Sequence, residues 1–355
     1  METKSAVQVS MEGNQPSLQL SVMVPARNEA ESIRDCLTSL TRQSEEGFRL
    51  GHDWELIVID DASSDATRQI TMEFDGITVL DAPALPKGWT GKANALWFAA
   101  QQARGKWLLF TDADTVHEPG NLHRALREAE RHRVATLSYS PRQLVRGLWQ
   151  GTLMTLIFAD LEQAYPPRLV NLADSRVAAA NGQFLMMQQE LYRRIGGHKA
   201  VRGSLLEDVE LARRCKQSGA ALRFRYAPDA VSTRMYRSFG AMCEGWRKNL
   251  AFLFPNALAR GLWKMVQFIL LFGLPLLAIW LYLTVARTAV IWAVGLWWIW
   301  RVRVHYAKAV KAHFSVADTL LSPLALPLFS WLFVSSWIHK NLRRSMTWKG
   351  RAYTP

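Results

Sequence analysis

Paired carboxylates follow apolar runs at two places in the first third of this sequence. Leu108–Phe110 lead into Asp112 and Asp114, and a Leu-Ile-Val-Ile run leads into Asp60 and Asp61. Mg²⁺ and Mn²⁺ prefer carboxylate oxygens as ligands, and such an ion neutralises the charge that develops on a leaving diphosphate. We therefore expect Asp112 and Asp114 to bind Mn²⁺ or Mg²⁺. Asp60 and Asp61 are expected to accept hydrogen bonds from a nucleoside, through its ribose hydroxyls or a uracil N–H.

Two further segments carry groups that suit an anionic ligand. A loop with Pro25, Arg27 and Glu29 follows the first apolar run, and Lys92 stands next to Gly91 at the start of an amphipathic segment. The N–H groups of a helix N-terminus favour a phosphate at such a place. The spacing is not that of a nucleoside-triphosphate P-loop. An ordinary polar loop and an ordinary helix start therefore remain the alternatives.

A third group of polar residues lies later in the chain. Gly182 opens a strand-like run, and Glu207 and Asp208 open an amphipathic segment. Acidic residues stabilise the first turn of a helix through its dipole, which is one interpretation of this pair. If the reaction deprotonates an alcohol, Asp208 is the best-placed general base by its order along the chain.

The elements that must position these residues alternate between strand and helix. An alternation with short connections predicts an α/β fold, with a mostly parallel sheet covered by helices on both faces. Ligands of such sheets bind at the carboxyl ends of the strands, where the polar residues above are placed. The expected strands are Leu20–Val24, Glu55–Ile59, Gly76–Leu80 and Lys106–Phe110, and the expected helices are Asn28–Arg42, Ser64–Glu73 and Lys92–Arg104.

Composition separates the end of the chain from its beginning. The chain has 355 residues, 43 Lys and Arg against 30 Asp and Glu, a formal charge of +13, and 15 Trp. Three cysteines without a CxxC pattern indicate neither a disulfide framework nor a zinc site. Because the basic residues concentrate around apolar runs and no recognition motif is present, we expect no nucleic-acid partner. The basic residues that precede the first apolar run are expected to face lipid headgroups; they are Arg234, Arg237, Arg247, Lys248, Arg260 and Lys264.

Three apolar segments follow, at Met265–Ala286, Thr288–Trp300 and Val316–Ile338. The first and third are long enough to cross about 30 Å of hydrocarbon, whereas the second must continue through Tyr306 to do so. Segments that are apolar on all sides, with Trp at their ends, favour a membrane over a soluble core. The earlier stretch Leu144–Phe158 fits either a helix at the bilayer surface or a core helix.

Basic residues follow both the second and the third apolar segment, and the positive-inside rule assigns such clusters to the cytoplasm. The first 20 residues lack the apolar core of a signal peptide, so the chain is expected to start in the cytosol. A helical hairpin followed by a re-entrant segment, broken at Pro323 or Pro327, would keep both clusters there. Three simple crossings would place the last cluster outside. The cytosolic C-terminus is favoured.

Taken in order, these motifs resemble the inverting family 2 glycosyltransferases with the nucleotide-sugar-binding GT-A fold. The resemblance covers about residues 20–250 and points to the membrane-attached branch with hopanoid-associated, carotenoid and ceramide glycosyltransferases. It rests on Pro-Ala-Arg-Asn-Glu at 25–29, Asp-Asp-x-Ser at 60–63, Gly-Lys-x-x-Ala-Leu at 91–96, Asp-x-Asp at 112–114 and Glu-Asp at 207–208.

The resemblance implies a role for each matching residue. The implied donor-binding residues are Pro25, Arg27, Glu29, Asp60, Asp61, Lys92 and Asp112, with Asp112 and Asp114 at the metal. Asp208 would be the base that activates an acceptor hydroxyl for a single, inverting displacement. Gly182, Glu207, Trp246 and Arg247 would lie on the acceptor and diphosphate side.

One departure from the family pattern concerns the segment before the membrane. Relatives that act on lipids or make polymers usually carry Gln-x-x-Arg-Trp, whereas residues 242–248 read Met-Cys-Glu-Gly-Trp-Arg-Lys. The Trp is present, and Arg247 or Lys248 would replace the missing cation. Long-chain processive synthesis is therefore not expected. Trp246 also fits an anchor at the membrane interface.

These observations favour an enzyme that moves one sugar from a nucleotide-sugar donor, expected to be UDP-linked, to a membrane lipid. A polysaccharide synthase that also exports its product and an inactive nucleotide-sugar-binding protein are the alternatives. The expected location is the cytoplasmic membrane, with the catalytic domain in the cytosol. The expected organisation is a flexible N-terminus at 1–17, a GT-A domain with interface helices at 18–256, two to three transmembrane or re-entrant helices at 257–340, and a basic tail at 341–355.

Overall fold

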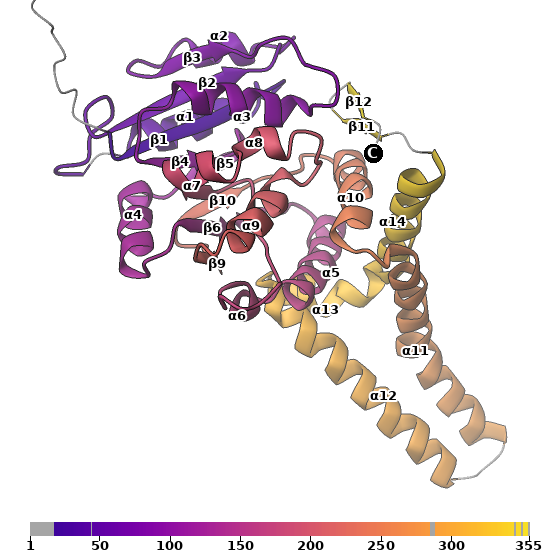
Figure 1. Cartoon of the computed structure of the whole chain (residues 1–355). Helices are drawn as coiled ribbons and strands as arrows, with labels where there is room; N and C mark the ends of the chain where they lie inside the picture. The colour runs from indigo at the N-terminus through magenta and orange to yellow at the C-terminus, as the bar shows by residue number, and fades with distance from the viewer. Residues whose placement is uncertain (1–17, 44, 285–287, 344–345, 349–350, 354–355) are drawn as a thin grey trace, which may run out of the picture.

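The computed structural model describes residues 18–43, 45–284, 288–343, 346–348 and 351–353. The N-terminal segment 1–17, which we expect to be flexible, lies outside the described residues. Figure 1 shows an α/β body from which a pair of long helices projects.

A mixed sheet of seven strands forms the centre of the body, in the order β3-β2-β1-β4-β8-β6-β9. The first four strands of that order are mutually parallel, and β6 and β9 are also parallel. β8 runs antiparallel to both of its neighbours. The strands are β1 (Leu20–Ala26), β2 (Trp54–Asp60), β3 (Thr78–Asp81), β4 (Trp107–Phe110), β6 (Thr136–Ser140), β8 (Leu185–Gln188) and β9 (Leu222–Tyr226). The predicted α/β fold class is confirmed.

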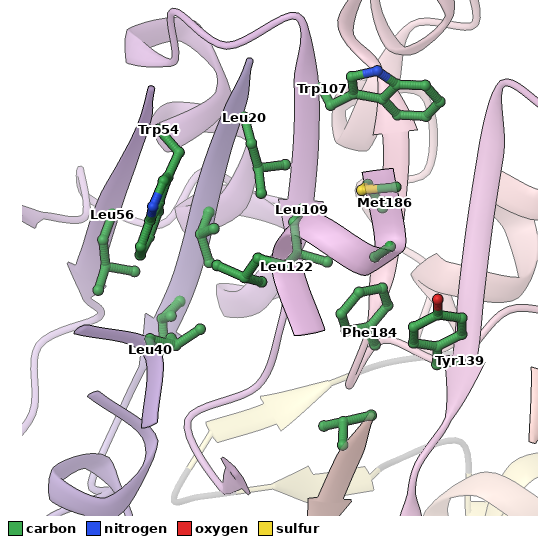
Figure 2. Close-up of a cluster of buried hydrophobic side chains, with 14 of the residues drawn as sticks. Leu20, Leu40, Trp54, Leu56, Trp107, Leu109, Leu122, Tyr139, Phe184 and Met186 are labelled. Atoms are coloured by element: carbon green, nitrogen blue, oxygen red, sulfur yellow. The ribbon is translucent and has the colours of Figure 1, made fainter. Parts of the chain in front are cut away.

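Alternate residues of the strands supply two hydrophobic cores, one on each face of the sheet. Val22 and Val24 of β1 face one core, and Met23 faces the other. Figure 2 shows part of the first core, in which Leu20, Leu109 and Phe184 point toward the covering helices. This core contacts α1 (Ile33–Thr41) and α4 (Asn121–Arg131), and the second contacts α3 (Gly91–Gln102), α7 (Gln189–Arg194) and α9 (Glu207–Gln217).

Short elements complete the body. A second sheet has the order β5-β10-β7, with β5 (Thr115–His117), β7 (Arg142–Gln143) and β10 (Val231–Thr233). The remaining helices of the body are α2 (Thr67–Thr71), α6 (Pro167–Val170) and α8 (Gly197–Ala200).

The first helix begins later than its sequence pattern predicts. We expect a helix from Asn28, but α1 begins at Ile33, because Asn28 adopts a left-handed backbone with φ of 51°. Its N–H donates to Ser63 Oγ at 3.1 Å, and its side-chain oxygen accepts from the N–H of Ser64 at 2.8 Å. These contacts fasten Asn28 to the loop after β2, and residues 30–32 form a turn at the cavity wall that leads into α1.

α5 (Leu148–Ala164) and the helices from α10 (Phe239–Leu253) onward form a second structural region. α5 and α10 lie beside the body, and α11 (Ala257–Thr284) and α12 (Thr288–Ala309) form the projecting hairpin of Figure 1. Among the described residues, two helical stretches are long and apolar enough to cross a membrane, Ala257–Thr284 and Val316–Leu342. Only 11% of the apolar window of the first is buried, against 50% for the second. α12 is not among them.

The third apolar segment is broken, as Pro323 suggests. It forms α13 (Val316–Leu321), a 3₁₀ turn over Ser322–Ala325 and α14 (Leu326–Ile338), followed by a π-helical turn over His339–Arg343 and the hairpin of β11 (Met346–Trp348) and β12 (Arg351–Tyr353). α14 packs against both α10 and α11, in one hydrophobic cluster with α5. The position expected to divide the domains, after residue 256, therefore falls within a shared core.

α5 belongs mainly to that core. Its central residues, including Leu153 and Ile157, are buried, whereas Leu148 and Trp149 in its first turn and Leu144 before the helix are exposed. The core-helix interpretation therefore describes the stretch 151–158, and the exposed apolar side chains of 144–158 lie in the first turn of α5 and before it.

Candidate functional site

A cavity of about 770 Å³ opens at the carboxyl ends of the central parallel strands. Its volume is in the range of small-molecule sites, and its position is the one at which doubly wound sheets bind ligands. It is lined by residues at the ends of β1, β2 and β4, by residues of α3, α9 and α10, and by the loop after β10. The sequence-predicted residues among them are Pro25, Arg27, Glu29, Asp61, Lys92, Asp112, Asp114, Gly182, Glu207 and Asp208.

The wall formed by the β1 and β2 loops is held together by hydrogen bonds between side chains and backbone groups. Arg27 Nη1 donates to the carbonyl oxygens of Asp61 at 2.5 Å and Ala62 at 3.1 Å. The N–H of Glu29 donates to Thr67 Oγ1 at 2.7 Å. These bonds fix the two loops against each other and leave both acidic side chains at the cavity wall.

Asp60 differs from its neighbour Asp61. It is buried and does not line the cavity, and its Oδ2 accepts from the N–H of Ser63 at 3.3 Å. This contact closes the turn after β2. The structure therefore places Asp60 beneath the site and Asp61 at its surface.

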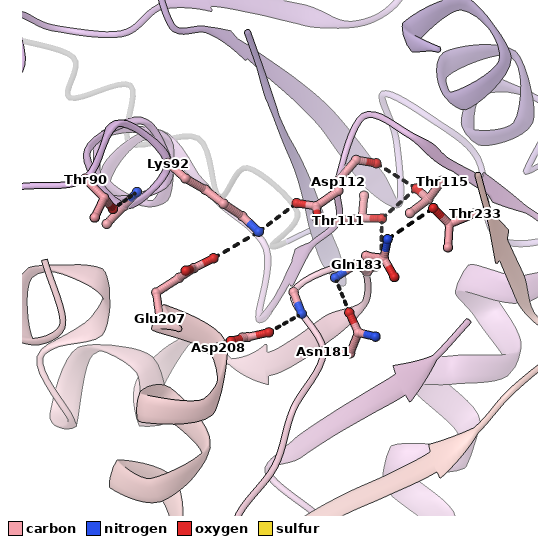
Figure 3. A network of polar contacts seen from close by, with 12 residues as sticks. Thr90, Lys92, Thr111, Asp112, Thr115, Asn181, Gln183, Glu207, Asp208 and Thr233 are labelled. Atoms are coloured by element: carbon pink, nitrogen blue, oxygen red, sulfur yellow. Dashed lines mark hydrogen bonds and ion pairs between the residues drawn. The ribbon is translucent and has the colours of Figure 1, made fainter. Parts of the chain in front are cut away.

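Lys92 is the centre of a charged network across the cavity floor, shown in Figure 3. Its Nζ lies 2.7 Å from Asp112 Oδ1 and 2.9 Å from Glu207 Oε1. Burial disfavours the ammonium, but the charges of the surrounding carboxylates raise the pKa of Lys92 well above its usual value. Lys92 is in the first turn of α3, where Thr90 caps the helix by accepting from the N–H of Ala93. A fixed positive charge thus stands beside the carboxylate pair.

Asp208 lies next to this network at the start of α9. Its Oδ2 accepts from the N–H of Gly182 at 2.7 Å, and its Oδ1 from the N–H of Val209 at 2.8 Å. Burial, together with the negative charge of Glu207, raises the pKa of Asp208 to about 6. Lys92 holds the pKa of Glu207 below its normal value despite burial. Asp208 is therefore the stronger proton acceptor of the two and is still mostly ionised at neutral pH.

Gly182 allows this close assembly. A Cβ at this position would lie 2.8 Å from Lys92 Nζ and 3.4 Å from Asp208 Oδ2. Any side chain would therefore displace the ammonium from its carboxylate partners. The requirement is a close approach rather than an unusual backbone angle.

Asp112 and Asp114 form a donor set that suits a divalent cation. Both line the cavity on the loop between β4 and β5. Among the described residues, no group of three His, Cys, Asp or Glu side chains is arranged to hold a metal. Mg²⁺ is usually held by one or two carboxylates together with substrate phosphates. The pair therefore fits an ion whose coordination a bound diphosphate completes.

α10 presents a different face to the cavity from the one its sequence suggests. Lys248 lines the cavity, whereas Trp246 and Arg247 do not. Trp246 is buried, and its Nε1–H donates to Met154 Sδ of α5 at 3.1 Å. This indole holds α10 against α5. The indole therefore neither lines the cavity nor occupies an exposed, interfacial position. Lys248, rather than Arg247, is the α10 cation near Glu207 and Asp208. Burial lowers the pKa of Lys248 to about 8.

Several lining residues are not among the sequence-predicted set. The loop after β10 brings Arg234, Tyr236 and Arg237 to the cavity, and Asn181 precedes Gly182 there. Arg237 Nη2 donates to the carbonyl oxygen of Glu31 at 2.6 Å, which links this loop to the β1 loop. Arg234 and Arg237, which we expected to face lipid headgroups, thus lie at the cavity. A basic pair directly after a short strand is the signal that could have identified them.

Comparison with known proteins agrees with this architecture. Residues 21–196 match the family described as "Glycosyl transferase family 2". The 4,4'-diaponeurosporenoate glycosyltransferase of Staphylococcus aureus (strain USA300) is 24% identical over 347 residues, covering 94% of this chain and 88% of the relative.

One solved structure is similar over most of the chain. It is the mannosyltransferase PcManGT from Pyrobaculum calidifontis, in complex with GDP-Man and Mn²⁺. The TM-score is 0.53 at 18% sequence identity, with 92% of this chain and 88% of that chain covered. The family match, the relative from S. aureus and the fold shared with the mannosyltransferase agree with the cavity at the sheet edge: residues 21–196 form a domain of glycosyltransferase family 2.

Proposed function

We propose that this protein transfers a single sugar, with inversion, from a nucleotide-sugar donor to a hydroxyl group of a membrane lipid. The observation that carries the proposal is the position of Asp208, a carboxylate with a raised pKa, in one cavity with Lys92 and the carboxylate pair. A base, a cation and two metal-binding carboxylates are the groups that a direct displacement at a sugar phosphate requires.

The β1 and β2 loops would bind the nucleoside of the donor. Asp61 and Glu29 line that wall and can accept from ribose hydroxyls or a base N–H. The earlier expectation of a UDP-linked donor stays a prediction. Lys92 and Lys248 would bind the diphosphate oxygens on the opposite side.

Asp112 and Asp114 would hold a divalent cation, Mn²⁺ or Mg²⁺, which would neutralise the charge of the departing diphosphate. The mannosyltransferase with the similar fold contains Mn²⁺ in its complex. Lys92, already paired with Asp112 Oδ1, would keep that carboxylate oriented toward the donor.

Asp208 would remove the proton of the acceptor hydroxyl as its oxygen attacks the anomeric carbon, and the diphosphate would leave from the opposite face. The N–H groups of Gly182 and Val209 fix the carboxylate, so little reorientation is needed at the moment of transfer.

A lipid acceptor is supported by the helices that continue from the cavity wall. Lys248 and Asn249 of α10 line the cavity, and the opposite face of α10 packs on α14. α14 and the apolar hairpin of α11 and α12 would attach the enzyme to the cytoplasmic membrane, with the catalytic domain on the cytosolic side. A lipid in that membrane would enter along α10.

A second acceptor chemistry is favoured by the name of the relative from S. aureus, because a diaponeurosporenoate carries a carboxylate. A carboxylate is ionised at neutral pH and needs no general base. The two acceptor classes therefore differ in their need for Asp208.

The test uses the full-length protein in a lipid extract with a panel of labelled nucleotide sugars and mass analysis of the products. One added sugar on a lipid hydroxyl, lost in Asp208→Asn, is expected. A product ester that persists in Asp208→Asn would assign a carboxylate acceptor. A polymer would assign a synthase, and donor binding without any transfer would assign an inactive binding protein.

A further inference from the structure

The base of the helical hairpin holds an unusual concentration of positive charge. Lys264 and Asp160 are both buried, and Lys264 Nζ lies 2.6 Å from Asp160 Oδ1. Arg260, one turn earlier on α11, has its Nη1 3.7 Å from the other oxygen of Asp160. This single carboxylate of α5 therefore already serves two cations of α11.

α12 adds further cations at the same level. The charges of Arg301 and Lys308 act on the ring of His305, and so does the charge of Lys264. In the part of the chain that the structure describes, neither Arg301 nor Lys308 makes a salt bridge to a carboxylate. Four cationic side chains therefore lie where α11, α12 and α5 meet, and Asp160 forms ion pairs with two of them, Lys264 and Arg260.

Arg301 is oriented into this region by aromatic rings. Its guanidinium lies over the rings of Trp263, at 5.3 Å, and Trp300, at 5.6 Å. Its Nε is buried and has no hydrogen-bond partner. A buried donor without an acceptor costs about 1–3 kcal/mol, and more when it is charged. The site thus lacks an acceptor group with negative charge.

The surroundings identify what would supply it. On the hairpin, Leu262, Trp263, Val266 and Ile269 are exposed, an apolar surface that belongs in lipid. Trp at this level is typical of the membrane–water interface. Lipid phosphates lie at the same depth and attract Lys and Arg.

We propose that the hairpin base binds the headgroup of an anionic phospholipid, with Arg301 and Lys308 as the principal contacts to its phosphate. The single negative charge of Asp160 cannot also neutralise Arg301 and Lys308, because Asp160 is already paired with Lys264 and Arg260. The bound headgroup supplies the missing counter-charge and the acceptor for Arg301. The proposal rests on insertion of the hairpin into a bilayer but not on the sugar-transfer reaction.

The chain offers a matched control in Arg303. It lies on the same helix, two residues from Arg301, and its side chain is exposed. It has the same charge and lies two residues further from the apolar run, and among the described residues only the guanidinium of Arg301 lies over the rings of Trp263 and Trp300. Arg301→Gln and Arg303→Gln therefore change net charge equally, but only Arg301→Gln removes a cation held over Trp263 and Trp300.

The experiment measures lipid retention by native mass spectrometry of the full-length protein, extracted from vesicles of phosphatidylglycerol and phosphatidylcholine. The wild type and Arg303→Gln are expected to retain phosphatidylglycerol in preference to phosphatidylcholine. Arg301→Gln is expected to lose about fivefold of that preference, the effect of one basic residue at a membrane surface. Inorganic phosphate added without anionic lipid is expected to leave thermal stability unchanged.

Equal retention in Arg301→Gln and Arg303→Gln would overturn the proposal, and so would equal retention of both lipids by the wild type. Stabilisation by inorganic phosphate alone would reassign the site to a soluble anion. Lys308→Gln repeats the test if Arg301→Gln does not fold. Loss of the protein from the vesicles in alkaline carbonate would refute insertion itself, which separates that failure from failure of the headgroup site or of the transfer reaction.

Discussion

The catalytic cavity and the hairpin base both contain buried charge, but they balance it differently. In the cavity, the ammonium of Lys92 lies between Asp112 and Glu207, so the protein supplies its own counter-charges. At the hairpin base, Asp160 pairs with two cations, Lys264 and Arg260. The first arrangement holds a site in shape before a ligand arrives. The second depends on an anion from outside the chain. Whether each cation has a carboxylate partner within the protein therefore distinguishes a catalytic network from a binding site for an external anion.

The largest effect is expected when the carboxylate pair of the cavity is broken. Asp114→Ala should reduce turnover below detection, because it removes one of two oxygen donors for the cation and several kcal/mol of charge stabilisation with it. Turnover with added Mn²⁺, with and without a chelator, is the measurement. Activity that survives the chelator would show that the cavity works with its own cations alone.

Removal of the proposed base should have the next largest effect. Asp208→Asn is expected to lower kcat about 10²- to 10⁴-fold, because an amide cannot take up the proton, while calorimetry should find donor affinity unchanged. Glu210→Gln is the control, since Glu210 is on the same helix, does not line the cavity and pairs with Arg213. An equal loss of donor affinity would reassign Asp208 to binding.

Adjacent cations of α10 allow a finer test of the cavity. Lys248→Gln should raise the KM for the donor about 10- to 100-fold, because a charge-assisted hydrogen bond contributes about 1.5–3 kcal/mol. Arg247→Gln should change it little, because Arg247 does not line the cavity. Steady-state kinetics of both variants decide the point. A larger rise in KM for Arg247→Gln than for Lys248→Gln would restore Arg247 as the residue on the diphosphate side.

The pH dependence follows from Asp208. Its pKa is raised to about 6, chiefly by burial and then by Glu207, and the base acts in its deprotonated form. Turnover should therefore be near its plateau at pH 7 and fall about tenfold per pH unit below 6. Rate profiles with saturating donor test this expectation. A profile that stays flat down to pH 5 would indicate an acceptor that needs no base.

A substitution at the hairpin base should have the smallest effect on activity but should clearly lower stability. Asp160→Asn leaves Lys264 buried without its carboxylate, which costs about 3–5 kcal/mol. Thermal unfolding in detergent, with and without phosphatidylglycerol, should show the loss and a greater dependence on the anionic lipid. If the variant is as stable as the wild type without that lipid, the contrast between the two regions is not real.

Sequence patterns predicted the strand ends well, and the reason is geometric. Carboxyl ends of parallel strands converge at one sheet edge, so Asp61 and Asp112 reach the same cavity wherever the intervening helices end. The placement of Lys92 follows similarly from the helix start beside Gly91. These positions need only the order of strands.

Other positions depend on packing that no local pattern reveals. On α10, one residue turns the side chain by about 100°, and the burial of Trp246 against Met154 decides that Lys248 faces the cavity. Arg234 and Arg237 follow β10, which belongs to a separate small sheet. The order of strands in the main sheet does not reveal that this sheet brings them to the cavity wall, so the sequence suggested lipid headgroups instead. The start of α1 was misjudged because Asn28 takes a left-handed backbone stabilised by distant residues.

The attachment of α14 to α10 also has a consequence for the order of events during synthesis. Ser336 Oγ accepts from the N–H of Ala251 at 2.8 Å, and Lys340 Nζ donates to the carbonyl oxygen of the same residue. The helix that carries Lys248 is thus held by residues that leave the ribosome much later. A nascent chain that has not yet made and positioned α14 would lack a fixed wall on one side of its cavity.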